Sequence, residues 1–215
     1  MTASTKAPQL FHAPFTCSLA VRLAAAWGDV KLAVLPVKLG CVETTAEKQL
    51  LAANPTGQVS TLILPDKSVL TETNTCLIWI QSQSKNDTFR RDPNSPDYYQ
   101  MLRWISFCST ELHKQLLRIV FYDEATDSVK ENFRTLAKSR LAVLYKHLTG
   151  QDVLAGDSVS AADAYLTWFL TLSGKAGVEI APYEHLQNYA NRQMADEEFQ
   201  KLLTDDAAVK ATISI

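Results

Sequence analysis

Residues 54–80 read NPTGQVSTLILPDKSVLTETNTCLIWI, and this stretch decides the fold. It opens with an Asn-Pro-Thr-Gly turn signal, in which Pro fixes φ and Gly allows positive φ. Two short apolar runs follow, at 59–64 and 69–70, and the turn residues between them predict a β-hairpin. Apolar residues then recur at helical spacing, which predicts a helix from Thr73 onward. We therefore expect two strands that lead directly into the start of a helix.

The start of that helix is a candidate ligand site. Glu72 and Thr73 stand directly before the helical pattern. Unpaired backbone N–H groups and a partial positive charge at a helix start favour a bound carboxylate. A ligand that carries both a carboxylate and an ammonium group could use the N–H groups and Thr73 for the first and Glu72 for the second.

The segments before this stretch alternate between strand and helix patterns. A helix that crosses between the first two strands implies a parallel strand pair with a right-handed connection. With the hairpin and the helix after it, the element order is β-α-β-α-β-β-α, which is the order of the thioredoxin-like α/β fold. The earlier predicted elements are a strand at 9–12, a helix at 17–27, a strand at 31–37 and a helix at 44–53.

The second half of the chain has only helical patterns. Residues 85–96 are polar and contain two prolines, which predicts a linker between domains. We therefore expect a thioredoxin-like domain at 1–84 and an all-α domain at 97–215. The helical segments of the second domain are predicted at 98–122, 127–148, 160–172, 182–194 and 196–203.

Composition excludes several classes of protein. The chain has 215 residues, 47% of them hydrophobic, which suits a globular protein with a core. The net charge of −2 argues against nucleic acid as a partner, and no apolar run is long enough to span a membrane. Four cysteines without a CxxC pair and four well-separated histidines predict free thiols and no metal site. Free thiols and the lack of a secretory signal indicate the reducing cytoplasm.

Three motifs resemble the glutathione transferases, and within them the bacterial beta class. The opening stretch resembles the family's N-P-x-G-x-V…L-x-E-[ST] motif. Pro14, Cys17, Ser18 and Leu19 match the beta-class P-x-x-C-S-L loop, and residues 104–114 (WISFCSTELHK) match its W-[LI]-x-[FY]-x-[AS]-[ST]-E-[LV]-H-K motif. The resemblance implies a thioredoxin-like domain followed by an all-α domain. It also implies a cytoplasmic homodimer that conjugates glutathione, its co-substrate, to a small electrophile in detoxification without a metal.

Cys17 is the first candidate catalytic residue. It stands at the start of a predicted helix, where unpaired N–H groups stabilise a thiolate and lower the thiol pKa. A lone cysteine is otherwise more often a buried structural thiol. The resemblance places Cys17 beside the sulfur of glutathione and makes Ser18 an alternative hydroxyl donor to that sulfur. It also implies that Glu72 and Thr73 bind the γ-glutamyl end.

The helical domain contributes a second set of candidates. In an α-helix Ser106 and His113, seven positions apart, would lie on one face. The resemblance implies that His113 and Lys114 reach glutathione and the second substrate. Ser106 stands where the family often has an Asn that donates to the cysteine sulfur. Lys38 is the nearest base to the position at which the family has a lysine for the glycine carboxylate of glutathione.

Two further sites follow from local sequence. Ser160 and Asp163 form a capping-box-like pair before an apolar run, which predicts a structural role. Ser60 follows Val59, the residue whose backbone binds the cysteinyl unit in the family, and stands where the family has a cis-proline. A cis bond before a non-proline residue costs about 2.5–4 kcal/mol, against roughly 0.5–1 kcal/mol before proline, so we expect Val59–Ser60 to be trans.

Two alternatives to the conjugating transferase stay open. The chain could be a glutathione-dependent thiol–disulfide or conjugate reductase that uses Cys17 covalently. It could also be a non-catalytic member of the family that acts as an interaction protein. His12 stands where many relatives have an aromatic hydroxyl, and we interpret it as the polar end of a strand.

Overall fold

The structure, a computed structural model, describes residues 7–213 and divides them into two compact units. Unit 1 holds the described residues up to Arg90 together with those from Glu197 onward. Unit 2 holds Arg91–Asp196.

Unit 1 is built on a four-stranded mixed sheet with the strand order β2-β1-β3-β4. β1 pairs in parallel with β2 and antiparallel with β3, and β3 pairs antiparallel with β4. Leu10, at the centre of the sheet, lies opposite both Val34 and Leu62 and is fully buried. The parallel pair and the hairpin confirm the predicted topology. The strands are β1 (Gln9–His12), β2 (Ala33–Pro36), β3 (Thr61–Ile63) and β4 (Val69–Thr71).

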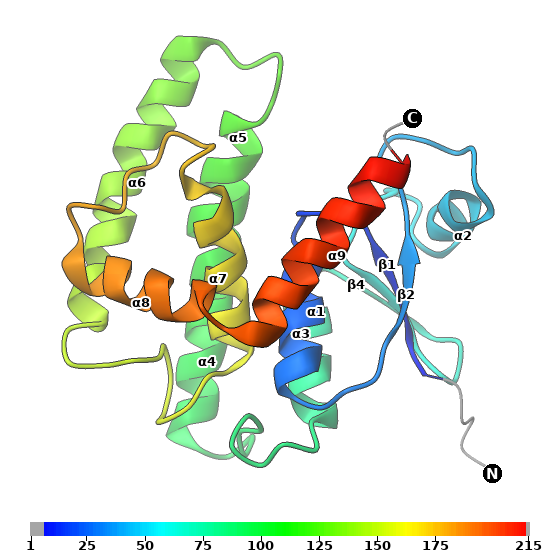
Figure 1. Cartoon of the computed structure of the whole chain (residues 1–215), viewed down its shortest axis with the longest axis horizontal. Helices are drawn as coiled ribbons and strands as arrows, with labels where there is room; N and C mark the ends of the chain where they lie inside the picture. The colour runs from blue at the N-terminus through cyan, green and yellow to red at the C-terminus, as the bar shows by residue number, and fades with distance from the viewer. Residues whose placement is uncertain (1–6, 214–215) are drawn as a thin grey trace. The chain divides into compact units, whose positions relative to one another are not determined.

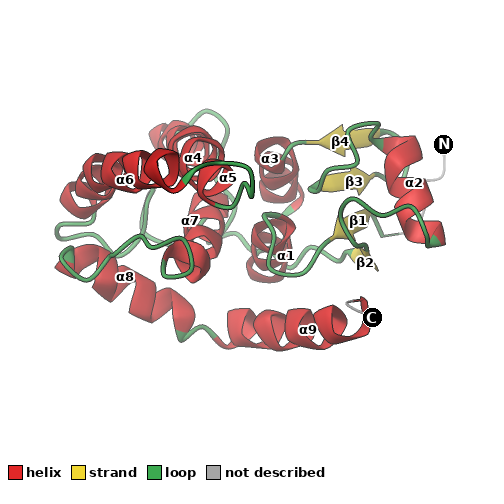
Figure 2. Ribbon diagram, turned by 90° about the horizontal axis from the view of Figure 1, so that it is seen from above, coloured by secondary structure: helices red, strands yellow, loops and turns green. Residues whose placement is uncertain are grey.

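Helices cover both faces of this sheet. Figure 2 shows α1 and α3 on one face and α2 on the other. α1 consists almost entirely of apolar residues, so most of it is buried, and Leu19 and Leu23 are buried completely. These helices are α1 (Ser18–Trp27), α2 (Thr45–Ala53) and α3 (Thr73–Gln83). Together with the sheet they give the thioredoxin-like order that the sequence predicts.

The Asn-Pro-Thr-Gly turn is organised by the side chain of Asn54. Its Nδ2 donates to the carbonyl of Gln58 at 3.0 Å, and its Oδ1 accepts from the backbone N–H of Thr56 at 3.2 Å. Gly57 has φ 63°, a conformation that glycine adopts without a Cβ penalty. The turn thus ends α2 and brings the chain into β3.

The first half of the predicted linker at 85–96 is packed against other residues of unit 1. The Asn86 side chain donates to the carbonyl of Trp27 at 2.9 Å, and the hydroxyl of Ser84 donates to the carbonyl of Gly28 at 2.9 Å. Phe89 is buried against Gly28, where an added Cβ would lie 3.2 Å from the ring. This part of the segment therefore belongs to unit 1.

Unit 2 is entirely helical in its described elements, and α7 is its central helix. Nearly all side chains of α7 are buried, including Tyr165 and Phe169. Because α7 is apolar on all sides, it is surrounded by the other helices of the unit. The helices are α4 (Pro96–Phe107), η1 (Cys108–Leu117), α5 (Arg118–Val120), α6 (Asp127–His147), α7 (Ala161–Ser173) and α8 (Glu184–Met194).

The long segment predicted at 98–122 is helical but not uniform. Its middle part, η1, is a π-helix, in which hydrogen bonds run from residue i to i+5. A π-helix has more residues per turn than an α-helix, so positions seven apart no longer stack as the α-helical spacing predicts. The α-helical spacing ends at Phe107, so it does not place Ser106 and His113 on one face.

The last helix, α9 (Glu197–Ile213), belongs to unit 1 (Figure 1). It packs against α1 and buries Phe199 and Asp206. The sequence predicted a helix only to 203 and an all-α domain over 97–215. The structure differs from that prediction because α9 extends to Ile213 and places its buried face on the thioredoxin-like unit.

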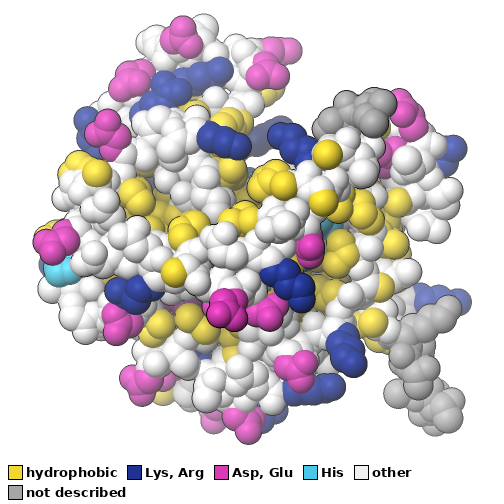
Figure 3. All heavy atoms as spheres, viewed as in Figure 1, with side chains coloured by type: hydrophobic (Ala, Val, Ile, Leu, Met, Phe, Trp, Pro, Cys, Tyr) yellow, Lys and Arg dark blue, Asp and Glu magenta, His cyan; other side chains and the backbone are white. Residues whose placement is uncertain are grey.

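The surface carries both signs of charge. On the face shown in Figure 3, basic and acidic side chains are interspersed. Among residues 7–213, none of the helices combines the length and the apolar character that crossing a membrane requires.

Candidate functional site

Cys17 lies where the loop after β1 enters α1. It is the N-cap residue of α1, and only 5% of it is exposed. Its Sγ donates to the carbonyl oxygen of Val59 at 3.3 Å. The contact joins the start of α1 to the loop before β3, two segments that are 42 positions apart in the chain.

The Val59–Ser60 loop continues this line of contacts to α3. The Val59–Ser60 peptide bond is cis, so the expectation of a trans bond was wrong. That expectation used only the local preference of the bond and ignored the packing of buried Ser60. The hydroxyl of Ser60 lies 3.3 Å from that of Thr73, the first residue of α3. Cys17, Val59, Ser60 and Thr73 therefore form one continuous row.

Glu72 stands beside this row as the N-cap of α3. Its φ of 69° lies in the left-handed region, where a non-glycine residue is uncommon. The side chain is exposed, whereas Thr73 is buried. A carboxylate is thus held in solvent directly next to the N-terminus of a helix.

Ser18 is the first residue of α1, directly after Cys17. Its side chain is fully buried, and its Oγ lies 2.8 Å from Nδ1 of His12 and 3.0 Å from Oγ1 of Thr16. The prediction that Ser18 donates to a glutathione sulfur stays a prediction, and in this structure the hydroxyl is bonded within unit 1. Thr16, half-buried beside Cys17, donates to the carbonyl of Ala13 at 2.8 Å.

Lys38 lies in the loop between β2 and α2, and its side chain is exposed. Its backbone N–H donates to the Glu47 carboxylate at 3.1 Å. The same carboxylate accepts from the backbone N–H groups of Glu43 and Thr44, each at 2.8 Å. These hydrogen bonds lower the pKa of Glu47, and the bond from the Thr44 N–H has the largest effect. Glu47 therefore fixes the loop that carries Lys38. The loop borders a cavity of about 190 Å³ lined by Lys38, Gly40, Cys41, Val42, Glu47, Leu50, Leu51, Thr56, Gly57 and Gln58.

The candidates of unit 2 lie in or next to the π-helix. His113 is held by Tyr165, whose phenol oxygen lies 2.8 Å from its Nδ1, and it packs edge-to-face on Trp168. Burial, and then the charges of Lys114 and Arg118, lower the pKa of His113 to about 4. The imidazole is therefore neutral at neutral pH, and its Nδ1 is hydrogen-bonded to the Tyr165 hydroxyl. Ser106 and Lys114 are exposed.

Ser160 and Asp163 begin α7, as the capping-box pattern predicts. Asp163 is fully buried, and its Oδ2 accepts from both the backbone N–H and the hydroxyl of Ser160 at 2.8 Å. Its Oδ1 accepts from the N–H of Leu154 and the phenol of Tyr189. Burial raises the pKa of Asp163, while these hydrogen bonds lower it. The pair closes the loop before α7.

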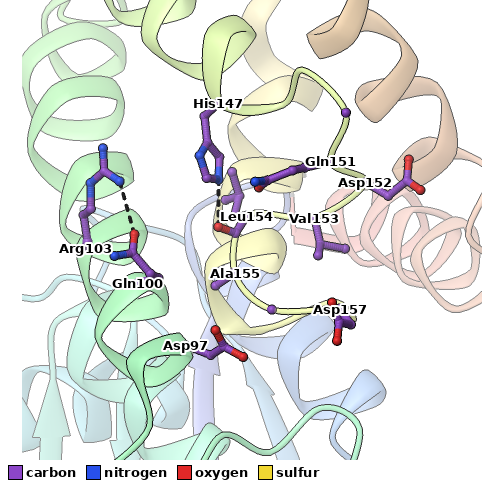
Figure 4. Close-up of a pocket in the computed structure, with 12 residues that line it drawn as sticks. Asp97, Gln100, Arg103, His147, Gln151, Asp152, Val153, Leu154, Ala155 and Asp157 are labelled. Carbon is purple, nitrogen blue, oxygen red and sulfur yellow. Dashed lines mark hydrogen bonds between the residues drawn. The ribbon is translucent and has the colours of Figure 1, made fainter.

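A larger cavity, of about 630 Å³, lies in unit 2 and contains none of the predicted site residues. Figure 4 shows that α4, the end of α6 and the loop after it form its walls. His147 donates across it to the carbonyl of Leu154, and Arg103 donates to Gln100 on the same helix. Its lining residues are Asp97, Gln100, Arg103, His147 and residues 150–157.

Two residues that sequence reasoning missed lie next to the Cys17 loop. His12 is fully buried and bonds both Ser18 and Asp206 of α9. The partners His12 and Asp206 are 194 positions apart, so no local pattern could have joined them. Among residues 7–213, no group of three or more His, Cys, Asp or Glu side chains is arranged to hold a metal ion.

Comparison with known proteins identifies the family. The family model for the C-terminal domain of glutathione S-transferase matches residues 107–197. The chain is 30% identical to a glutathione S-transferase of Xanthomonas campestris pv. campestris, over 91% of this chain and 97% of the relative. The chain belongs to the glutathione S-transferase family. This transferase therefore carries the predicted thioredoxin-like and helical architecture as a family property.

Solved structures give the same assignment. The transferase is similar to a sphingomonad glutathione S-transferase complexed with glutathione, with a TM-score of 0.86 and 30% identity over 93% of this chain and 98% of that one. It is also similar to a bacterial beta-class enzyme of Sphingomonas chungbukensis, with a TM-score of 0.83 and 27% identity over 92% of this chain and 98% of that one. The predicted resemblance to the beta class is confirmed.

Proposed function

We propose that this transferase conjugates glutathione to a small electrophile, with the glutathione sulfur beside Cys17. The observation that carries the proposal is the row from Cys17 through Val59 and Ser60 to Thr73 in unit 1. It joins a thiol at the start of α1 to a carboxylate and hydroxyl at the start of α3. A tripeptide thiol with a zwitterionic end has groups that match both ends of this row.

In this proposal different parts of the row bind different parts of glutathione. Thr73 and the N-terminus of α3 hold the γ-glutamyl carboxylate, and Glu72 holds its ammonium group. The backbone of Val59 binds the cysteinyl unit, and Lys38 binds the glycine carboxylate. The start of α1 then stabilises the thiolate, and positioning of the two reactants supplies the rest of the rate enhancement.

In this proposal the residues that interact with the electrophile belong to unit 2. His113 is neutral at neutral pH, so it acts as a hydrogen-bonding group and not as a cation. Lys114 is the exposed cation next to it. Ser106 is too short to replace the longer amide of the family, so we propose that it contributes little.

The location and assembly of the transferase are part of the same proposal. The free thiols of Cys17, Cys41, Cys76 and Cys108 suit the reducing cytoplasm. We infer a homodimer with two-fold symmetry from the family. We expect neither nucleic acid nor a membrane as a partner, because the net charge of −2 offers no basic footprint.

The proposal is tested by glutathione binding and by conjugation to chlorodinitrobenzene. Glu72→Gln removes the proposed ammonium ligand, so glutathione affinity should fall about tenfold, the effect of losing one charge-assisted hydrogen bond. Glu198→Gln, which removes an exposed carboxylate of unit 1 on α9, is the matched control and should bind glutathione like the wild type. Equal affinity in the two variants would contradict the assignment of Glu72.

The same preparation separates conjugation from the covalent alternative. Conjugation that persists in Cys17→Ala excludes an obligatory covalent role of Cys17 in that reaction. Loss of disulfide reduction in that variant, with no conjugation in the wild type, would instead support the reductase. A dimer that binds no glutathione in calorimetry would support the interaction protein.

A further inference from the structure

Asp206 is a fully buried carboxylate that joins α9 to three other segments of unit 1. Its Oδ1 accepts from Nε2 of His12 at 2.8 Å and from the guanidinium of Arg22. Its Oδ2 accepts from the backbone N–H of Phe15 at 2.7 Å. One side chain of the last helix thus binds the end of β1, the loop after it and α1.

His12 is hydrogen-bonded at both ring nitrogens. A carboxylate only accepts hydrogen bonds, so Nε2 of His12 donates to Asp206. Nη1 of Arg22 lies 3.2 Å from the same Nε2 and also donates to Asp206. Nδ1 of His12 lies 2.8 Å from the hydroxyl of Ser18, which can donate to a ring nitrogen or accept from it. The contacts thus run without a break from Ser18 through His12 to Asp206.

A Ser–His–Asp set suggests a hydrolase triad, but burial excludes that use. Ser18, His12 and Asp206 are each fully buried, so no substrate carbonyl can reach the serine oxygen. The three residues therefore have a structural role. They adjoin the loop that ends at Cys17, so this loop is the part of unit 1 that they hold in place.

The loop between β1 and α1 is held at two points. Phe15 has φ 61°, in the left-handed region, and its N–H is bound by Asp206. Ser18, three residues later, is bound by His12. Cys17 lies between these two points, so both contacts set the position of its sulfur.

We propose that Asp206 and His12 are positioning residues of the transferase, which hold the Cys17 loop in the conformation that serves the reaction. The inference rests on the proposed function, because it takes Cys17 to be the residue beside the glutathione sulfur. Asp206 acts on the loop directly at Phe15 and through His12 at Ser18. The C-terminal helix is in this way part of the active thioredoxin-like unit.

The decisive variant is Asp206→Asn, with Asp205→Asn as its matched control. An amide cannot accept at both atoms, so either the Phe15 N–H or the His12 and Arg22 groups at Oδ1 lose their acceptor. Asp205→Asn removes the same charge from the next residue, which is half-exposed and bonds only Arg22 in the described contacts, at 3.3 Å. We expect Asp206→Asn to lower kcat about tenfold to a hundredfold, the range that misplacement of a reacting group causes. Asp205→Asn should keep the wild-type kcat.

A second pair of variants tests the two links one at a time. In His12→Asn the amide oxygen can replace Nδ1 and accept from Ser18, while the link to Asp206 is lost. In His12→Gln the amide N–H can replace Nε2 and donate to Asp206, while the link to Ser18 is lost. Each should lower kcat less than His12→Ala. These variants carry the test if Asp206→Asn does not fold, because Asp206 keeps its contacts with Phe15 and Arg22.

The readouts separate positioning from stability and from the proposed function. Glutathione affinity, measured by calorimetry, should stay within about threefold of wild type, because misplacement of the loop leaves the proposed γ-glutamyl site intact. The alkylation rate of Cys17 should change in the Asp206 and His12 variants. Variants that lose thermal stability but keep the wild-type kcat and alkylation rate would overturn the proposal. If the wild type conjugates nothing, the proposed function fails, while the alkylation rates still decide whether Asp206 and His12 position Cys17.

Discussion

The Nδ1 atom of His113 lies 2.8 Å from the phenol oxygen of Tyr165, so the π-helix is joined to the central helix of unit 2. The Tyr165 hydroxyl can donate to Nδ1 or accept from it, so the neutral ring keeps this hydrogen bond. Burial, followed by the nearby charges of Lys114 and Arg118, lowers the pKa of His113 from 6.5 to about 4. Unfolding releases the side chain into water, where it binds a proton more readily.

His113 should therefore make the protein less stable in acid. Because its pKa is lower when folded, its contribution is complete above pH 6.5 and is lost as the pH falls toward about 4. We expect a loss of about 1–3 kcal/mol in the free energy of unfolding over that range. His113→Gln should show a smaller acid loss in urea unfolding, and His185→Gln, on α8, is the control. An identical acid loss in His113→Gln and wild type would contradict this assignment.

Cys17 should be alkylated fastest among the cysteines at neutral pH. It starts α1, where a helix terminus stabilises a thiolate. Burial raises the pKa of Cys76 to about 12 and also raises that of Cys108, so both should stay unreacted in the folded protein. The measurement is the pH dependence of iodoacetamide labelling, read for each cysteine by mass spectrometry. If Cys17 reacts no faster than half-buried Cys41, the helix-terminus argument is wrong.

Asp163→Ala should destabilise unit 2 strongly without changing glutathione affinity. The variant leaves the buried N–H groups of Leu154 and Ser160 without their acceptor. Each such group costs roughly 1–3 kcal/mol, so we expect a loss of about 3 kcal/mol or more in urea unfolding. Ser160→Ala, which removes one cap hydroxyl, should cost only about 1 kcal/mol. Similar costs for the two variants would show that the carboxylate has no special part in holding the loop.

The transferase should form a two-fold symmetric dimer in solution. Light scattering in the micromolar range should give a particle of twice the 23.9 kDa chain mass. The thioredoxin-like part alone is small for an independent core, which favours association. A particle of one chain mass at every concentration in that range would contradict the prediction.

Much of the fold could be predicted because its signals are local. The turn residues at 54–57, the hairpin after them and the helical periodicities each lie within about ten residues, and the structure has all of them. The Ser160–Asp163 pair is likewise three positions apart and forms as predicted. The motif at Cys17 placed that residue at a helix start, where it lies.

The features that only the tertiary structure decided involve residues that are far apart in the chain. The hydroxyl of Ser18 contacts His12 in the interior of unit 1, a contact that no local pattern indicated. α9 was assigned to the helical domain, yet it packs on unit 1. Its buried Asp206 needs donors, and among residues 7–213 these are His12, Arg22 and the Phe15 N–H. Local sequence encodes turns, caps and periodicity. The partner of a buried polar group depends on the folded chain, which brings positions 194 residues apart into contact.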